Sequence, residues 1–407
     1  MKALRLLLVP FALLVVAAMR LGLPIRFGAI MSTRIGHMAG NMECYLCERE
    51  AGLSKGLDFF YHVGEPADMQ LAKMLARVVR IDPTPFARIC DLLNRAFVGW
   101  QKNAIDTAQV DRDILNLFEK QGPHLSFTSE EHVRGFNGLR AMGIPSDVFK
   151  HLSPKWVCLM ARDAGYLPHL AYHSYRDSDI DTYEQAAIAL AERGYYVVRM
   201  GAKVVKPFKV NHPRVIDYAT KHKSDFMDIY LGAHCAFALS NGCGIDAVPV
   251  IFRRPVCYVN YVPVEYLQTY NAGSLAIWKH HEKDGKRMTF AEIIESGAGQ
   301  FMRADEFEEA GIKLVDNTPE EIAAVALEMA DYISMPRPFK WQQQEEFWRT
   351  FPRSVSQYNQ KPLHGEIRMR IGAEFLRQYQ ERLPELYQAS PDDFVHEEQW
   401  ARAFHGD

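Results

Sequence analysis

From Pro24 onward, short apolar runs rich in β-branched and aromatic residues alternate with longer stretches whose apolar residues recur at helical spacing. In the first part of the chain this pattern predicts strands at 25–32 and 57–63 and helices at 36–51, 68–79 and 85–97. Strands that alternate with helices form a mainly parallel sheet covered by helices. The pattern therefore predicts an α/β protein.

The pattern is interrupted and then restarts, which predicts a second domain. Polar and turn-rich stretches at 101–112 and 121–129 precede a predicted helix at 130–142. The later part is predicted to form strands at 156–161, 195–200, 236–240 and 255–262 and helices at 181–193, 224–234, 245–252 and 319–333. A length of 407 residues also exceeds the roughly 150 expected of one domain. We expect an apolar segment at 1–23, α/β domains at 24–150 and 151–337, and a helical tail at 338–407 that packs across them.

Composition excludes several classes of protein. Hydrophobic residues make up 48% and charged residues 24% of the chain, which is too apolar for a disordered protein. Lys and Arg total 47 against 50 Asp and Glu, whereas a dedicated nucleic-acid binder usually carries a basic excess. We therefore expect an enzyme with a large core and no nucleic-acid partner.

Cysteine usage favours a reducing compartment. The seven Cys are an odd number, spread along the chain and mostly inside apolar runs, unlike a disulfide framework. Cys44 and Cys47 form the one close pair, and no second Cys pair or His pair stands at ligand spacing. We interpret them as two buried, reduced thiols on one helix face rather than as a zinc or redox site. The cytoplasm fits this usage best.

The N-terminus carries the one membrane signal of the sequence. Residues 6–19 are uncharged and lie between two pairs of basic residues, Lys2 with Arg5 and Arg20 with Arg26. The run is shorter than the roughly 20 apolar residues of a bilayer span, contains a proline, and lacks a clear secretory cleavage site. Flanking cations suit a helix at the anionic inner face of the cytoplasmic membrane. A peripheral or monotopic anchor is therefore favoured over a span, a signal peptide or an ordinary packed helix.

The sequence feature that points most clearly to a ligand-binding site is the glycine-rich loop after the predicted strand at 236–240. Its candidate nucleotide-sugar-binding residues are Ser240, Asn241, Gly242, Gly244 and Asp246. Glycines at a strand–helix junction let a ligand approach the backbone, and a helix start offers free N–H groups to phosphate. Ligands of open α/β sheets bind at the carboxyl ends of strands, where this loop would lie. Asp246 could hold a ribose or sugar hydroxyl; the alternative is a plain tight turn in which Asp246 caps the helix.

A further strand end and a helix start carry candidates for the same ligand. Arg199 and Gly201 close the strand at 195–200, where a cation and a glycine could meet a diphosphate. Ser224, Asp225 and Asp228 begin the helix at 224–234. These three could reach a nucleotide or could cap that helix.

The segment after the first strand of the second half collects charged residues. They are Arg162, Asp163, Arg176, Asp177 and Asp179. Arginine forks bind phosphate oxygens through two hydrogen bonds, and carboxylates can take or give a proton. Arg162 is thus a candidate donor-binding residue, and the other four are candidate catalytic residues. An internal salt-bridge network, with Asp179 as a helix cap, is the alternative.

In the first half, the strand at 25–32 runs into a loop that offers candidates for the acceptor side. Arg34, Gly36 and Asn41 are the candidate acceptor-side residues, and His37 is a candidate catalytic base for an acceptor hydroxyl. An unperturbed imidazole pKa near 6.5 suits that work. A purely structural role for His37 is the alternative.

Separated runs along most of the chain are similar to one protein family. They are FG at 27–28, STRIGH at 32–37, YLCER at 45–49, YRDSDID at 175–181, RMG at 199–201, SDFMDIYLG at 224–232, GIDAVPVIFR at 244–253, HGEI at 364–367 and RIGA at 370–373. Together they resemble a bacterial glycosyltransferase family associated with surface-polysaccharide synthesis. The arginine-bearing segment at 175–181 is also loosely similar to a motif of fucosyltransferase-type enzymes. The resemblance implies a GT-B-like fold, with two Rossmann-like domains facing a cleft and a nucleotide sugar held mainly by the second.

The resemblance and the placement of the candidates together predict transfer of a sugar from a nucleotide-diphosphate sugar to a lipid-linked or polysaccharide acceptor. Arg176 and Arg199, with the helix start at Gly244, would stabilise the departing diphosphate. No cofactor is expected, and metal independence is favoured. The expected partners are the nucleotide sugar, a glycan or lipid-linked acceptor and the inner-membrane surface. A sugar-nucleotide epimerase on the same scaffold and a non-catalytic polysaccharide-assembly partner are the alternatives.

Overall fold

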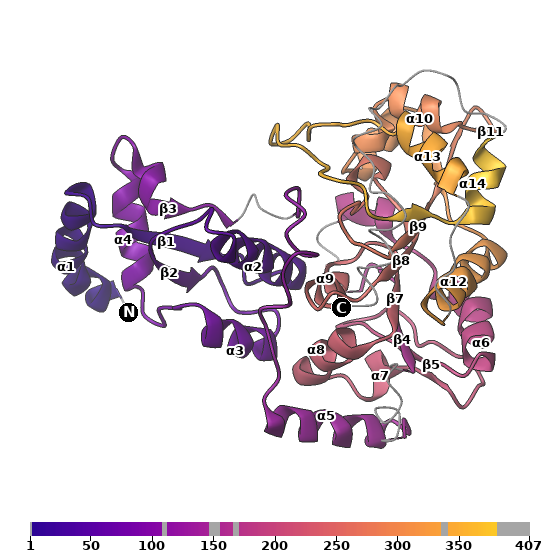
Figure 1. Ribbon diagram of the computed structural model, residues 1–407, viewed down its shortest axis with the longest axis horizontal. Coiled ribbons are helices and arrows are strands. Elements are labelled where there is room, and N and C mark those ends of the chain that lie inside the picture. Colours follow the sequence, from indigo (N-terminus) through magenta and orange to yellow (C-terminus); the bar gives the residue numbers. More distant parts are fainter. Residues whose placement is uncertain (1, 108–111, 146–154, 166–170, 335–340, 381–407) are drawn as a thin grey trace.

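The computed structural model describes residues 2–107, 112–145, 155–165, 171–334 and 341–380. The predicted boundary between the two α/β domains, near 145–154, falls mostly outside the described residues, as does the end of the predicted tail. Two parallel sheets, one in each half of the chain, lie side by side and are covered by helices (Figure 1).

The first sheet has the strand order β2-β1-β3, and all of its pairs are parallel. Its strands are β1 (Ile25–Ile30), β2 (Leu57–His62) and β3 (Ala104–Ile105). The predictions at 25–32 and 57–63 are confirmed. The two-residue strand β3 was missed, because so short a strand has no periodicity and is defined only by its pairing with Phe27 and Gly28.

Helices cover both faces of this sheet. They are α1 (Lys2–Arg20), α2 (Ile35–Glu50), α3 (Met69–Val78) and α4 (Phe86–Arg95). Because side chains alternate along a strand, Phe27 and Tyr61 face one core with α1 and α4, whereas Ile30 and Phe60 face the other with α2 and α3. The three predicted helices are confirmed. Within the described residues, none of the helices combines the length and apolarity that a membrane crossing needs.

The second sheet has seven parallel strands in the order β13-β9-β8-β7-β4-β5-β6. Its strands are β4 (Trp156–Met160), β5 (Tyr196–Arg199), β6 (Val215–Ile216), β7 (Phe237–Ser240), β8 (Val256–Tyr261), β9 (Leu275–Trp278) and β13 (Arg370–Ile371). The sheet grows from β4 outward to β6, then reverses and grows from β7 to β9. This is the Rossmann strand order, with its topological switch point between β4 and β7. The predicted α/β fold with two Rossmann-like domains is confirmed.

Further elements surround the second sheet. The helices are α5 (Ser129–Ala141), α6 (Glu184–Glu192), α7 (Tyr218–Lys221), α8 (Asp225–His234), α9 (Ala247–Ile251), α10 (Phe290–Glu295), α11 (Ala304–Glu309), α12 (Pro319–Ser334), α13 (Trp341–Thr350) and α14 (Ala373–Gln380). A small antiparallel sheet is formed by β10 (His280–Lys283), β11 (Lys286–Arg287) and β12 (Ile312–Val315). All predicted helices of this half are present, although α6 and α9 are shorter than expected because single 3₁₀ turns precede them.

The expectation of a purely helical tail without a further βα unit is wrong. β13 pairs with β9 and is followed by α14, so the tail completes the second sheet. β13 has only two residues, and its pairing with Leu275 and Ala276 joins positions far apart in sequence. The tail aromatics Phe347, Phe375 and Tyr379 pack with their ring centroids 4.8–5.7 Å from that of the fully buried Trp278. The tail is therefore part of the core of the second domain.

The helix α5 packs against the second domain through a glycine. It begins with a capping box in which Thr128 and Glu131 exchange side-chain and backbone hydrogen bonds. A Cβ atom added to Gly135 would lie 2.1–2.4 Å from atoms of the Tyr230 ring. The Tyr230 ring is thus seated directly on the helix backbone.

We predict opposite effects for two Gly→Ala substitutions in helices. At Gly40 in α2, an added Cβ would meet nothing within 4 Å, so Gly40→Ala is expected to raise the free energy of unfolding by up to about 1 kcal/mol through helix propensity. At Gly135 the clash with Tyr230 should outweigh that gain, so Gly135→Ala is expected to lower the free energy of unfolding by about 1–3 kcal/mol. Urea-unfolding midpoints of the two variants measure the difference. Equal midpoint shifts would contradict the packing of Tyr230 against Gly135 of α5.

Candidate active site at the domain junction

The carboxyl ends of the two sheets meet at a contact between two glycines. Gly36 lies in the first turn of α2, after β1, and Gly244 lies in the loop after β7. A Cβ atom added to Gly36 would lie 2.9 Å from the carbonyl oxygen of Gly244, which is too close for any larger residue. The predicted acceptor-side loop and the predicted donor loop are therefore brought into direct contact.

Asn241 joins the loops at the topological switch point of the second sheet. Its Oδ1 accepts a hydrogen bond from the Arg162 backbone N–H at 3.0 Å. Its Nδ2 donates to the carbonyl of Arg176 at 2.8 Å and to Ser178 Oγ at 3.1 Å. Asn241 is fully buried, so it positions the arginine-bearing segment against the end of β4.

Three arginines converge on this point: Arg34 of the first domain and Arg162 and Arg176 of the second. Together they form the arginine cluster. Arg162 Nε donates to Asp177 Oδ1 at 3.0 Å, and Arg176 Nη1 lies 3.4 Å from the Gly242 carbonyl oxygen. Burial lowers the pKa of His173 to about 4, together with the charges of Arg176, Arg162 and Arg34. Because all three guanidinium groups disfavour a charged imidazole at His173, the electrostatic potential in this region is strongly positive.

Much of this positive charge is uncompensated. The guanidinium of Arg34 makes no hydrogen bond or ion pair with any residue in the described ranges, and the Nε of Arg176 is buried without a partner among them. Arg34 is also the N-cap residue of α2, whose first turn has no side-chain cap. The positive dipole end of α2 adds to the field. The junction thus offers positive charge to an anion.

Asp246 lies beneath the glycine loop. Its carboxylate accepts from Ser240 Oγ at 2.9 Å and does not cap α9. Burial raises the pKa of Asp246 to about 7, although the charge of Arg176 opposes the shift. Because the residue is only 3% exposed, the predicted contact with a ribose or sugar stays a prediction.

Arg199 lies one strand away from the cluster, inside an ion network. Its guanidinium is fully buried, with nitrogens 3.4 Å from Asp217 and 3.9 Å from Asp163. Asp163 also accepts from the backbone N–H groups of Gly165 and Val205. Gly201 follows Arg199 and packs against Val204. For Asp163, this network agrees with the internal salt-bridge alternative given for the charged segment after β4.

Asp177 and Asp179 differ in their surroundings. Burial raises the pKa of Asp177, although the paired Arg162 opposes the shift. Asp179 is exposed, pairs with Lys206 at 2.5 Å and accepts from the Asp181 N–H at the start of a 3₁₀ turn. Asp177 is therefore in the arginine cluster, whereas Asp179 is on its outer surface.

The residues at the start of α8 bind other groups than the arginine cluster, and one of them, Asp225, binds the first domain. Ser224 caps α8 by accepting from the Met227 N–H, so the capping alternative is confirmed for this residue. Asp225 accepts from the N–H of Met69 at the start of α3, and Asp228 accepts from Tyr218 OH at 2.7 Å. Lys223 lies 3.1 Å from Asp225 and 3.3 Å from Asp228 and partly neutralises them.

Among the remaining first-domain candidates, His37 lies in the first turn of α2, beside Gly36, and is half-buried. Asn41 is 3% exposed, and its Nδ2 donates to the Thr107 carbonyl at 2.6 Å. Asn41 thus holds α2 to the segment after β3.

Sequence reasoning missed two polar residues at the sheet edges. They are Lys279, whose Nζ donates to the Asp177 carbonyl at 2.6 Å, and His62, whose Nδ1 lies 2.6 Å from Ser32 Oγ. Lys279 directly follows an apolar run that was not assigned as a strand, and His62 ends a predicted strand. A search for polar residues at every strand end would have found both of these.

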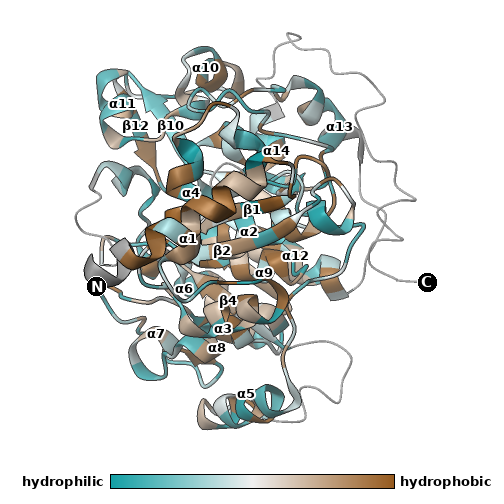
Figure 2. Ribbon diagram, turned by 90° about the vertical axis from the view of Figure 1, so that its left-hand side faces the viewer, coloured by the Kyte–Doolittle hydropathy of each residue, from teal (hydrophilic) through white to brown (hydrophobic). Residues whose placement is uncertain are grey.

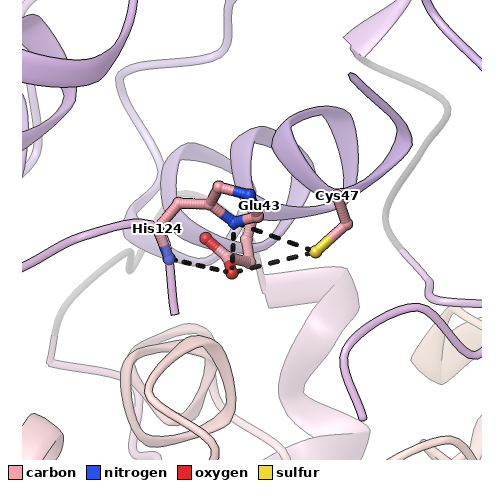
Figure 3. A group of neighbouring side chains, drawn as sticks. All are labelled: Glu43, Cys47 and His124. Carbon is pink, nitrogen blue, oxygen red and sulfur yellow. Dashed lines mark hydrogen bonds and ion pairs between the residues drawn. The ribbon is translucent and has the colours of Figure 1, made fainter. Parts of the chain in front are cut away.

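A separate cluster, formed by Glu43, Cys47 and His124, has the residue types of a metal site (Figure 3). Glu43 and Cys47 project from one face of α2 toward His124, with Glu43 Oε1 3.0 Å from His124 Nδ1. Arg253 Nη2, however, lies 2.7 Å from Glu43 Oε1 and 3.6 Å from Cys47 Sγ. Burial raises the pKa of Cys47 to about 12, and the predicted reduced, buried thiols are present at Cys44 and Cys47. A cation of the second domain therefore already neutralises Glu43.

This cluster acts as an electrostatic clamp between the domains. Arg253 follows α9, Glu43 lies on α2, and His124 in the connecting segment also lies 2.9 Å from Glu50. The hydrogen bond and charge of Glu43, with Glu50, raise the pKa of His124, although its partial burial opposes this. A raised folded-state pKa means that the charged imidazole stabilises the fold below about pH 6.5, and that this contribution is lost as the pH rises through the folded-state pKa.

We predict a pH-dependent effect of removing this imidazole. The melting temperature of His124→Gln should fall below that of the unmodified protein at pH 6, and the gap should narrow by pH 9. Differential scanning calorimetry at both pH values measures the gap, with His222→Gln at an exposed site as the control. A gap of equal size at both pH values would show that the charge of His124 contributes nothing.

Comparison with known proteins finds remote similarity to glycosyltransferases. No family model and no curated protein sequence matches the chain. A family 9 glycosyltransferase from Veillonella parvula is 9% identical, with a TM-score of 0.40 over 75% of this chain and 97% of the other. The iron-containing heptosyltransferase TibC, solved with ADP-D-β-D-heptose, is 13% identical, with a TM-score of 0.36 over 76% and 77%. The Escherichia coli heptosyltransferase WaaC with ADP is 11% identical, with a TM-score of 0.31 over 70% and 99%.

Proposed function

We propose that the protein transfers a glycosyl group from a nucleotide-diphosphate sugar to a lipid-linked or polysaccharide acceptor in bacterial surface-glycan synthesis. The observation that supports this most is the uncompensated positive charge of Arg34 and Arg176 at the domain junction. It lies beside the switch point of the Rossmann sheet, where such folds bind their ligands. A diphosphate would supply the negative charge and the acceptor oxygens that are missing around these arginines.

In the proposed reaction, the bond from the anomeric carbon to the diphosphate oxygen breaks as a bond to the acceptor oxygen forms. The electron pair of the broken bond goes to the diphosphate, so negative charge increases there in the transition state. Arg176, Arg34 and the start of α2 are positioned to stabilise this charge, with Arg162 fixed by Asp177 beside them. These cations would do the work of a metal ion, so we propose a metal-independent reaction without a cofactor.

The acceptor hydroxyl must lose a proton in the same step. The candidates for the base remain His37, Asp163, Asp177 and Asp179. Of these, His37 comes from the first domain and is adjacent to Gly36 at the junction. We propose His37 as the base, because it can approach an acceptor on the side opposite to the nucleotide-binding second domain.

We predict that the two uncompensated arginines are needed for turnover. Arg176→Ala should lower kcat by about 10²–10³-fold, as expected for the loss of a group that stabilises developing charge. Arg34→Ala should lower kcat by roughly ten- to a hundredfold. Lysine at either position should restore part of the rate, and Arg140→Ala on the exposed face of α5 serves as the control. The measurement is release of nucleoside diphosphate from a panel of UDP-, GDP- and ADP-linked sugars, with a CMP-linked sugar, which would release CMP, as the monophosphate comparison.

Other outcomes of the same assay would contradict glycosyl transfer. Formation of an isomerised sugar nucleotide without an acceptor would instead identify an epimerase. Nucleotide binding with no turnover over a broad acceptor panel would identify a non-catalytic assembly partner. Unchanged turnover in Arg176→Ala would remove the proposed diphosphate contact.

We also propose that the protein docks on the inner face of the cytoplasmic membrane through α1. Ala12, Val16 and Met19 are buried against the first domain, whereas the opposite stripe of α1 exposes 63–69% of Leu7, Phe11 and Leu14. Because one face packs on protein, the proposed mode is a helix that lies along the surface. The apolar colour of α1 and α4 on one side of the molecule is visible in Figure 2.

The apolar surface extends beyond α1 and is surrounded by positive charge. Val98 is 99% exposed and adjoins α1 through a hydrogen bond from Arg20 to its carbonyl. Among the described side chains of α1, α4 and the following 3₁₀ turn, the exposed charged residues are all basic. The acidic residue of these elements, Asp91, is buried. This charge is complementary to anionic lipid headgroups.

Substitutions in α1 should separate membrane docking from folding. Phe11→Glu with Leu14→Glu is expected to abolish sedimentation with phosphatidylglycerol vesicles without a change in melting temperature, because both side chains are exposed. The matched control is Val133→Glu, which is 59% exposed on α5. Equal sedimentation of the double variant and the control would rule out docking through α1.

A further inference from the structure

A cavity of about 240 Å³ lies where both domains, the connecting segment and the tail come together. Its wall includes Glu48 from α2, Leu115 from the connecting segment, Tyr266 from the second domain, and Asn359 with Lys361 from the tail. These segments are far apart in the sequence, so the cavity exists only when the two domains and the tail are assembled. None of these residues belongs to the arginine cluster.

The cavity wall carries polar groups with unused hydrogen-bonding capacity. The carboxylate of Glu48 makes no hydrogen bond or ion pair with any described residue, and its partial burial raises the pKa of this carboxyl group, against the charge of Lys361. Asn359 accepts from the Lys361 N–H through its Oδ1, which leaves its amide N–H groups without a partner in the described ranges. A carboxylate acceptor, an amide donor and an ammonium group therefore surround one space.

The same wall also has an aromatic ring fixed in place. Tyr266 OH lies 2.7 Å from Ser356 Oγ, and the guanidinium of Arg112 lies 5.8 Å from the centre of the Tyr266 ring. Arg112 in turn donates to the carbonyls of Tyr266 and Leu363. A rigid ring and apolar wall with a few polar groups suit a ligand that has an apolar face and several hydroxyls. A pyranose ring is such a ligand, and the volume suits a single one.

The position of the cavity relates it to the junction. Counting from Gly36 at the glycine contact, Glu48 lies twelve residues further along α2, which is about 18 Å at the rise of an α-helix. On the other side, Tyr261 donates to the Tyr266 carbonyl at 2.8 Å and its ring packs against Gly242. The cavity is thus connected to the glycine loop, yet too far from it to hold the sugar that is being transferred.

We propose that this cavity is a carbohydrate subsite that holds a pyranose unit of the acceptor glycan, at a distance from the reacting hydroxyl. The subsite rests on the proposed function only for its role as an acceptor site. Glu48 and Asn359 bind the sugar hydroxyls, and Tyr266 packs on the apolar face of the ring.

Saturation-transfer NMR tests this subsite on the full chain, with the methyl glycosides of glucose, galactose, mannose and N-acetylglucosamine as probes. At least one probe is expected to receive saturation from the protein. Leu115→Trp, at a side chain 46% exposed, should fill the cavity and weaken that binding at least tenfold. Glu48→Gln keeps the shape and should weaken it less. The matched control for added bulk is Val133→Trp on α5.

Two results would overturn the subsite: no binding of any of the four glycosides, or binding that Leu115→Trp leaves unchanged. The melting-temperature rise with UDP, GDP, ADP and CMP is measured on the same samples. A nucleotide response without glycoside binding removes the subsite and leaves glycosyl transfer intact. Glycoside binding without any nucleotide response keeps the subsite as a sugar site and removes the proposed function.

Discussion

The contact between Gly36 and Gly244 determines how the two domains can meet. Because the backbones are so close that a Cβ on Gly36 would lie 2.9 Å from a carbonyl oxygen, the start of α2 is placed beside the loop that follows β7. The carboxyl edges of both sheets then share one junction, and Arg34 of the first domain comes within electrostatic range of Arg162 and Arg176 of the second. A larger residue at Gly36 would separate the edges and dilute the positive charge.

The distribution of counter-charges distinguishes structural arginines from those available to a ligand. Arg199 is balanced by Asp217 and Asp163, and Arg253 is balanced by Glu43. Arg34 and Arg176 have no such acidic partner among the described residues. Partnered arginines contribute to the fold, because leaving a buried charge unpaired is costly. The unpartnered pair is what makes the junction a site for an anion.

The fold was predictable from sequence where local periodicity is strong, and the site only in part. The strands and helices around Ile30 and Tyr61 were predictable because each strand has apolar residues on both faces, and each face packs against a separate core. The short strands β3 and β13 were not, because their pairing depends on residues far away in the chain.

Burial explains the differences at the site. Asn241 and Arg199 carry the side chains of ligand-binding residues, yet both are fully buried and bind other parts of the protein. Arg34, expected on the acceptor side, lies at the shared junction with the donor-side arginines. Which polar residue ends up exposed is decided by tertiary packing, which local sequence patterns do not encode.

A crystal structure with a bound nucleoside diphosphate is the most direct test of the shared anion site. The diphosphate should lie between Arg34 and Arg176 at the start of α2, so that both domains contact it. A diphosphate bound elsewhere, with neither arginine in contact, would contradict an anion site formed by the two domains together.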